Sequence, residues 1–223
     1  KSDSFFAIHT KWKWEDFESN LQVLSEFPLL HYKMAVLRFR ENNLESSHKH
    51  LKALRAHHGS FRRSDYLLAK ICLKEKNNNQ ARLHLEDALL NDDPQIIQIH
   101  NLLVPIYIKR NENELARKSL LKLYSSNTNR TKALESLYEL HNRENRLDQL
   151  LPLLQEEVTK NESSNLKKLL GISYYKLRKF PQANAALSEL EDQEARFFKC
   201  LSLNQMNEFT LAIQCFKNLE KEA

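Results

Sequence analysis

Apolar side chains recur three and four residues apart through most of the chain, as Met34, Ala35 and Leu37 illustrate. Short polar stretches rich in asparagine separate these segments, for example at 42–43 and 77–79. Spacing of this kind is typical of amphipathic helices that bury one face. Asparagine tolerates the left-handed backbone that a tight turn between two helices requires. The pattern therefore predicts paired helices joined by short turns.

The helical pairs repeat along the chain with a nearly constant period. A mostly small residue begins the buried face of each second helix, at Ser47, Ala81, Ala116, Gln149, Ala183 and Ala212. A second column lies twelve residues earlier, at Ala35, Ala69, Val104, Leu137, Gly171 and Cys200. Small side chains allow close approach where two helices cross, so each pair of columns predicts one helix-turn-helix unit.

These units resemble the tetratricopeptide repeat (TPR), whose helix-turn-helix motif has about 34 residues. The fifth unit matches best, with Leu170-Gly171, Tyr174, Ala183 and Leu187 at the Leu-Gly, Tyr, Ala and Phe positions of the motif. Gln149 in the small column and Arg38 in the aromatic column depart from it. The resemblance covers residues 28–223 and implies an all-α solenoid of about six stacked antiparallel helix pairs in a right-handed superhelix. Residues 1–27 are expected to form an N-terminal partial repeat or cap helix.

Composition agrees with a helical chain and argues against several other classes. With 2 Gly and 5 Pro among 223 residues, turn formers are too few for a many-stranded sheet. No run of about 18 apolar residues occurs, so no membrane-spanning segment is predicted. The formal charge of +5 is spread along the chain and is weak evidence for a nucleic-acid partner. The chain begins at Lys1, so a fragment that lacks its targeting signal is one interpretation, with the cytoplasm as the expected compartment.

The three cysteines, Cys72, Cys200 and Cys215, fall at positions where a helix places a small buried side chain. They are odd in number and include no C-x-x-C pair. We therefore expect three packed thiols, which suits a reducing compartment.

No catalytic motif is found in the sequence. It lacks a glycine-rich phosphate loop, H-E-x-x-H and G-x-S-x-G. His48 and His50 should point to different helix faces, and the neighbouring lysines would repel a cation. The acid pairs 92–93 and 156–157 are expected at exposed turns or helix ends. The sequence predicts no enzyme activity, no cofactor and no metal site.

Proteins of the TPR family bind peptides on the surface lined by the first helix of each unit, so the resemblance implies such a surface here. The inward positions are rich in cations and aromatic rings, and Glu194 is their one acid. The predicted partner-binding residues are Tyr32, Phe39, Arg40, Arg63, Tyr66, Lys70, Lys74, Lys109, Tyr138, Lys168, Tyr175 and Lys176. Cations beside amphipathic rings suit an acidic partner segment with apolar anchors. The most concentrated contact is expected at Arg40, Tyr66, Lys70 and Lys74.

Three other interpretations remain open from the sequence alone. The predicted surface could be a solvated face with ordinary surface aromatics. The basic run from His48 to Arg63 could bind RNA through phosphate contacts, although no repeating side-chain code accompanies it. Self-association through Phe216 and Leu219, or through Phe5 and Phe6, would make the chain an assembly subunit.

Overall fold

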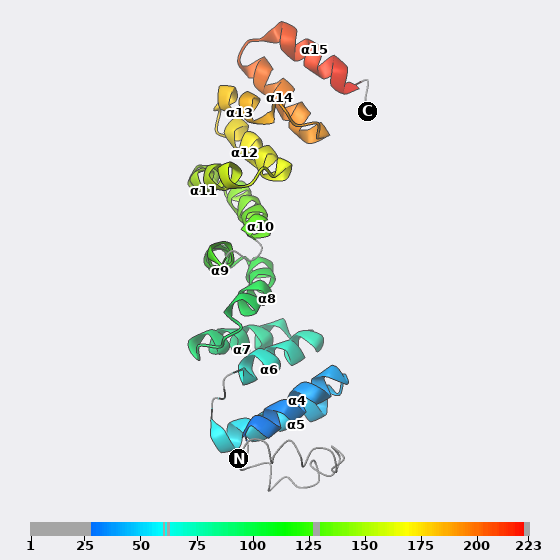
Figure 1. Ribbon diagram of the computed structural model, residues 1–223, viewed down its shortest axis with the longest axis vertical. Coiled ribbons are helices and arrows are strands. Elements are labelled where there is room, and N and C mark those ends of the chain that lie inside the picture. Colours follow the sequence, from blue (N-terminus) through cyan, green and yellow to red (C-terminus); the bar gives the residue numbers. More distant parts are fainter. Residues whose placement is uncertain (1–27, 60, 62, 127–129, 221–223) are drawn as a thin grey trace. The chain divides into compact units, whose positions relative to one another are not determined.

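The computed structural model describes residues 28–59, 61, 63–126 and 130–220, and within them the secondary structure is entirely helical. The predicted cap in 1–27 lies outside this part of the chain. The described helices, in chain order, are α4 (Pro28–Arg40), α5 (Leu44–His58), α6 (Ser64–Lys74), α7 (Asn78–Leu90), α8 (Ile96–Lys109), α9 (Asn113–Ser125), α10 (Arg130–Arg143), α11 (Leu147–Lys160), α12 (Ser164–Lys176), α13 (Phe180–Leu187), α14 (Gln193–Gln205) and α15 (Phe209–Glu220) (Figure 1).

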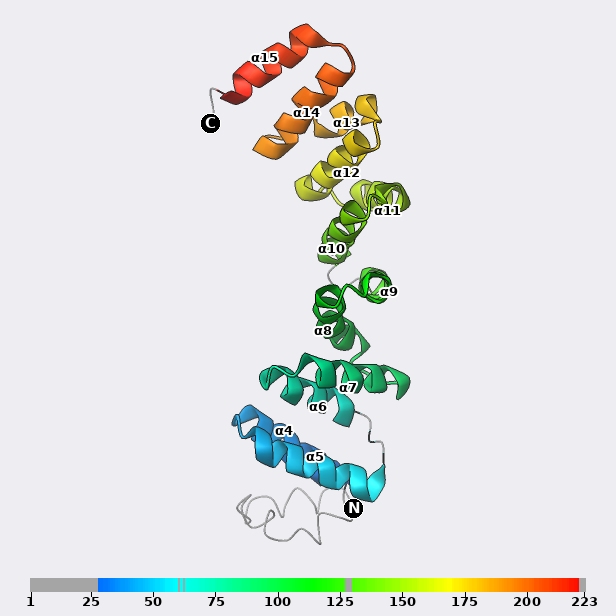
Figure 2. The same cartoon turned by 180° about the vertical axis from the view of Figure 1, so that it is seen from behind.

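These helices fall into two compact units, Lys1–Arg110 with α4 to α8 and Asn111–Ala223 with α9 to α15. In the first unit α4 packs against α5 and α6 packs against α7, and both pairs lie side by side from either viewpoint (Figures 1 and 2). The close approach of α4 and α5 is visible in one bond, because Ser47 Oγ donates to the Ala35 carbonyl across 2.7 Å. A larger side chain at either position would push the two backbones apart.

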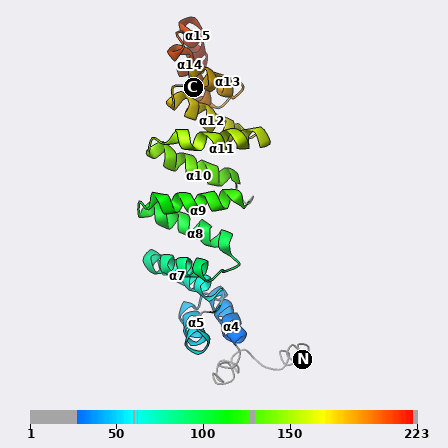
Figure 3. The ribbon, with the colours of Figure 1, turned by 90° about the vertical axis from the view of Figure 1, so that its left-hand side faces the viewer.

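In the second unit α9 contacts α10 (Figure 3), and the pairs α12–α13 and α14–α15 repeat the hairpin arrangement (Figure 1). Gly171 lies where α12 crosses α13, and a Cβ atom added there would overlap the side chain of Leu187. Glycine at this position is therefore a packing requirement. The all-α repeat of paired helices predicted from the sequence is confirmed within each unit.

The turn inside each helix pair contains one residue with left-handed backbone, and these residues are Asn42, Lys76, Asn111, Asn145, Arg178 and Asn207. Asparagine occupies four of the six positions, as its tolerance of this conformation predicts. In the second pair Lys76 takes the left-handed conformation instead. Asn77 caps α7 there by accepting a hydrogen bond from the Gln80 amide at 3.1 Å.

The left-handed residue lies five positions before the small-residue column of the second helix, at Ser47, Ala81, Ala116, Ala183 and Ala212, and the same count corrects the predicted frame of the fourth repeat. Counting five from Asn145 gives Leu150, which is 1% exposed, whereas the predicted Gln149 is exposed. The same shift puts Tyr138 in place of Leu137 in the earlier column. Ala81, Ala116 and Ala183 are each fully buried, so the prediction for the other units is confirmed.

Two further expectations are wrong. Cys200 and Cys215 form a disulfide that joins α14 to α15, and only Cys72 is a free buried thiol. One residue of each acid pair is buried, contrary to the prediction: Asp93 is 1% exposed and Glu157 is fully buried. Hairpin packing brings Cys200 against Cys215 and Glu157 against Arg130. Asp93 accepts a hydrogen bond of 2.8 Å from the Gln95 amide in the connection before α8. No local sequence pattern shows these contacts.

No helix in the described ranges is long and apolar enough to cross a membrane.

Candidate functional site

In the first unit, cations and aromatic rings gather where α6 lies beside α4. Lys70 Nζ lies 5.0 Å from the centroid of the Phe39 ring and 5.6 Å from that of Tyr66. Lys74 Nζ lies 4.6 Å from the Phe39 centroid and donates a hydrogen bond of 2.8 Å to Asn42 Oδ1. We call Phe39, Tyr66, Lys70 and Lys74 the α4–α6 face. Lys70 and Lys74 follow Tyr66 at intervals of four, so one stripe of α6 carries all three.

Electrostatically, the α4–α6 face has two uncompensated positive charges. Within the described residues, no carboxylate lies within ion-pairing distance of the Lys70 or Lys74 ammonium. Aromatic quadrupoles attract these ammonium groups and hold them over the rings, but they do not neutralise the charge. The structure therefore brings Tyr66, Lys70 and Lys74 together, with Phe39 as the ring that both lysines share.

The phenols of Tyr66 in the α4–α6 face and of nearby Tyr32 are neutral at ordinary pH. Burial raises the pKa of Tyr66, and the nearby Asp93 carboxylate raises it further. Burial also raises the pKa of Tyr32, where Arg63 opposes and Asp93 reinforces the shift. The Tyr32 ring lies 5.5 Å from the ring of Phe61, a contact that the sequence pattern does not reveal. Both tyrosines thus offer an apolar ring with a hydroxyl donor.

The other predicted residues of the first unit lie at its margins. Arg40 is the last residue of α4 and has an exposed side chain. Arg63 precedes α6 in a left-handed conformation and is also exposed. Lys109 ends α8 and lines a separate depression with Lys76 and Arg110.

The corresponding surface of the second unit is electrostatically different. Lys168 Nζ lies 3.2 Å from Asp192 Oδ2 and 3.3 Å from Glu194 Oε2. Burial lowers the pKa of Lys168, but the bonds to these two carboxylates outweigh burial and shift it upward. Lys176 donates a bond of 2.7 Å to Asn142 Oδ1, much as Lys74 does to Asn42.

Tyr175 belongs to a group of rings rather than to a charged contact. Its centroid lies 5.2 Å from that of Phe198 and 5.7 Å from that of Phe180. Phe197 extends the group and is 44% exposed. This part of the second unit therefore presents aromatic surface next to a neutralised lysine.

Tyr138 is not on the accessible surface predicted for it, because the buried column of the fourth repeat lies one residue later than the sequence predicts. Its side chain is 9% exposed, and Leu134 and His141 on the same helix are also buried. In the corrected frame the inward positions of α10 include Glu135, which is half-buried, and Glu139, which is exposed. The second unit is therefore richer in acids than the sequence frame suggested.

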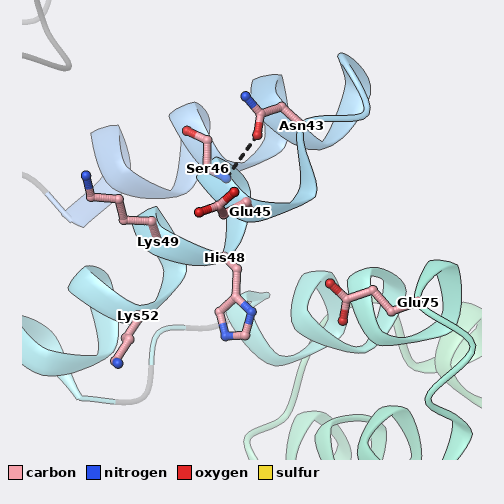
Figure 4. A pocket seen from close by; sticks show the side chains of 7 residues that line it. All are labelled: Asn43, Glu45, Ser46, His48, Lys49, Lys52 and Glu75. Atoms are coloured by element: carbon pink, nitrogen blue, oxygen red, sulfur yellow. Dashed lines mark hydrogen bonds between the residues drawn. The ribbon is translucent and has the colours of Figure 1, made fainter.

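A depression of about 710 Å³ lies on a different side of the first unit, between α5 and the end of α6 (Figure 4). His48, Lys49 and Lys52 reach it from α5, and Glu75 comes from the end of α6. Glu45 lies beside these cations, so the charges here are mixed. This is the basic run that raised the RNA interpretation. Within that run, Arg55 is engaged with Asp65 at 2.6 Å.

Asp65, His84 and Asp87 bring three possible metal ligands within 4.8 Å of one another. The Arg55 guanidinium already lies 2.6 Å from Asp65 Oδ1 and 3.9 Å from Asp87 Oδ2. Burial raises the pKa of Asp65, which Arg55 opposes, and Asn91 donates to its second oxygen at 3.3 Å. The arginine thus supplies the positive charge that these carboxylates need, and we assign the cluster a structural role.

No family model matches the sequence, and no curated protein matches it. Solved structures do share its fold. YrrB, described as a TPR protein with an unusual peptide-binding site, has a TM-score of 0.59 at 17% identity, covering 90% of this chain and 97% of its own. A TPR repeat-containing protein from Cytophaga hutchinsonii has a TM-score of 0.61 at 13% identity, covering 85% and 78%.

The chain is also similar to part of a longer protein. The structure of Naa15/Naa10 bound to HypK-THB contains a chain with a TM-score of 0.69 at 13% identity. That match covers 98% of this chain but 36% of the other. At these identities the comparisons define the fold alone. The chain has an all-α, TPR-like helical-repeat fold.

Proposed function

We propose that this chain is a protein-interaction scaffold that binds an acidic, partly apolar segment of a partner protein on the α4–α6 face. The observation that carries the proposal is the pair Lys70 and Lys74, held over Phe39 without a carboxylate partner among the described residues. The role is binding rather than catalysis.

The chemistry of the face favours carboxylates flanked by apolar side chains. Two ammonium groups near one ring repel each other, and a carboxylate that approaches both relieves this repulsion. The lysine positions are already restricted by the Phe39 ring and by the Asn42 amide, so less side-chain entropy is lost on binding. Phe39 and Tyr66 add apolar surface next to the charges, where an anchor residue can be buried.

The second unit contributes differently in this proposal. Lys168 is already neutralised by Asp192 and Glu194, so it has little to offer a second acid. Tyr175 and Lys176 provide an aromatic ring and a hydrogen-bonding ammonium for other parts of the partner. The acidic contact is therefore assigned to the first unit. The fold neighbours are in keeping with a binding role, since the YrrB structure is described by its peptide-binding site.

The test compares two charge reversals in the same unit. The probe is a fluorescent synthetic peptide of alternating acidic and Leu or Phe residues. The double variant Lys70→Glu with Lys74→Glu should weaken its binding about tenfold or more. The matched control, Lys49→Glu with Lys52→Glu, makes the same charge change on α5 and should leave affinity within about twofold.

Circular dichroism should show the same helical content for both double variants, because all four lysines lie on exposed or partly exposed surface. Equal loss of affinity in both variants would mean that the peptide senses net charge and not the α4–α6 face. Unchanged affinity in the Lys70 and Lys74 variant would refute the proposal.

A further inference from the structure

The last helix of the second unit is held to its neighbour by few buried contacts and one covalent link. Cys200 of α14 and Cys215 of α15 form a disulfide across a sequence separation of 15 residues. Ala212 is the one buried residue of α15. Phe209, Leu211 and Ile213 are each more than half exposed. In the α14–α15 pair, seen at the C-terminal end of Figure 1, the second helix therefore combines a single buried residue with a covalent link to its neighbour.

The two sulfur atoms differ in their access to solvent. Cys200 is fully buried in the column where helices cross. Cys215 is partly exposed and lines an open depression of about 450 Å³. Arg196 and Lys199 of α14 line the same depression. A thiolate that enters it meets two cations and reaches the Cys215 sulfur first.

We propose that Cys215 is a thiol-exchange site and that the Cys200–Cys215 disulfide is a reducible clasp for α15. A low-molecular-weight anionic thiol of the glutathione class is the co-reactant. Its thiolate attacks the Cys215 sulfur, the bond to Cys200 breaks, and Cys200 leaves as a thiolate that takes a proton. A second thiolate then attacks the mixed disulfide at its external sulfur. Two external thiols are oxidised to one disulfide, and the two cysteines are reduced.

Opening the clasp should loosen α15 while leaving the first unit unchanged. A disulfide that closes a loop of this length limits the conformations of the open state, and its loss increases local opening on the order of a hundredfold. The exposed apolar residues of α15 provide no packing to compensate, because they contact solvent in the closed state.

Hydrogen exchange followed by mass spectrometry tests this on the 223-residue chain without any variant. Peptides from 209–220 should exchange on the order of a hundredfold faster after treatment with a phosphine reductant, while peptides from α6 and α7 do not change. Unchanged exchange in 209–220 would refute the clasp. So would three free thiols in the denatured, unreduced protein, because the closed form has one, Cys72.

The site of exchange is tested with two single variants and oxidised glutathione. In Cys200→Ser the remaining Cys215 should form the mixed disulfide rapidly. In Cys215→Ser the buried Cys200 should react at least about tenfold more slowly. Cys72 serves as an internal reference in both, because burial raises the pKa of its thiol and keeps it protonated. Equal rates at Cys200 and Cys215 would overturn the assignment of Cys215.

Discussion

The hydroxyl of Tyr124 donates a hydrogen bond of 3.1 Å to the carboxylate of Glu157, which is fully buried. Arg130 Nη2 lies 2.9 Å from the same carboxylate oxygen. In the other five helix-pair repeats the equivalent position holds an apolar residue, namely Leu54, Ala88, Leu123, Leu190 or Leu219. The fourth repeat thus has a buried acid where an apolar residue is usual, compensated by one cation, one phenol and the side-chain amide of Asn161.

Removing this acid should destabilise the second unit strongly. Glu157→Ala removes the carboxylate that the Arg130 guanidinium and the Tyr124 hydroxyl contact, and we expect a loss of about 3 kcal/mol in the free energy of unfolding. The adjacent Glu156 is exposed and pairs with Lys160, so Glu156→Ala should cost less than about 1 kcal/mol. Urea denaturation of both variants gives the comparison. Similar losses would contradict the buried network.

The corrected frame of the fourth unit predicts opposite tolerance at two neighbouring positions. Leu150 is 1% exposed and Gln149 is exposed. Leu150→Ala should therefore cost about 2–5 kcal/mol through the cavity it leaves. Gln149→Ala should change stability by less than about 0.5 kcal/mol. The reverse order of the two effects in thermal denaturation would restore the original register.

This register error shows what the sequence could and could not predict. The repeat period and the buried columns follow from helical spacing alone, because small residues mark the crossings in most units. The fourth unit has no small residue at 149 or at 150, so that signal is absent there. The turn residue Asn145 contained the missing information. In every helix-pair repeat the left-handed turn residue lies five positions before the buried-column residue of the second helix.

The candidate site was predicted to a similar degree. Tyr66, Lys70 and Lys74 share a helical stripe, so their proximity follows from spacing, and Phe39 follows from the repeat. The pairing of Lys168 with Asp192 and Glu194 depends on contact between successive units, which the spacing within one helix does not reveal. The Cys200–Cys215 bond also depends on hairpin geometry. Burial of Glu157 required knowing that Arg130 lies beside it.

Gly171 provides a test of the close approach between α12 and α13. A methyl group there would overlap Leu187, and we expect Gly171→Ala to lose about 1–2 kcal/mol although alanine favours helix. In a Leu187→Ala background the overlap is gone, so the same change should stabilise by about 1 kcal/mol. The sign of the effect should therefore reverse between the two backgrounds. The same sign in both would show that the helices do not meet at Gly171.

The buried phenol of Tyr138 predicts a late step in an alkaline titration. Burial raises its pKa from 10.0 to about 12, and the Glu194 carboxylate adds to the shift. Its stabilising contribution is complete below pH 10 and is lost as the pH rises through about 12, of the order of 2 kcal/mol in total. Tyr32 and Tyr66 also have raised pKa values, so the late part of the phenolate absorbance should lose the amplitude of one tyrosine in Tyr138→Phe. A Tyr138→Phe curve with the same late amplitude as the unmodified chain would contradict the assignment.

The most direct measurement of the central claim reverses the charges on the α4–α6 face and on the peptide ligand, separately and together. Two probe peptides of equal length are compared, one with acidic residues between Leu and Phe, the other with lysine at each acidic position. The unmodified chain should prefer the acidic peptide, and Lys70→Glu with Lys74→Glu should prefer the basic one, each by about tenfold in Kd. If the double variant keeps the preference of the unmodified chain, the α4–α6 face does not bind the acidic segment.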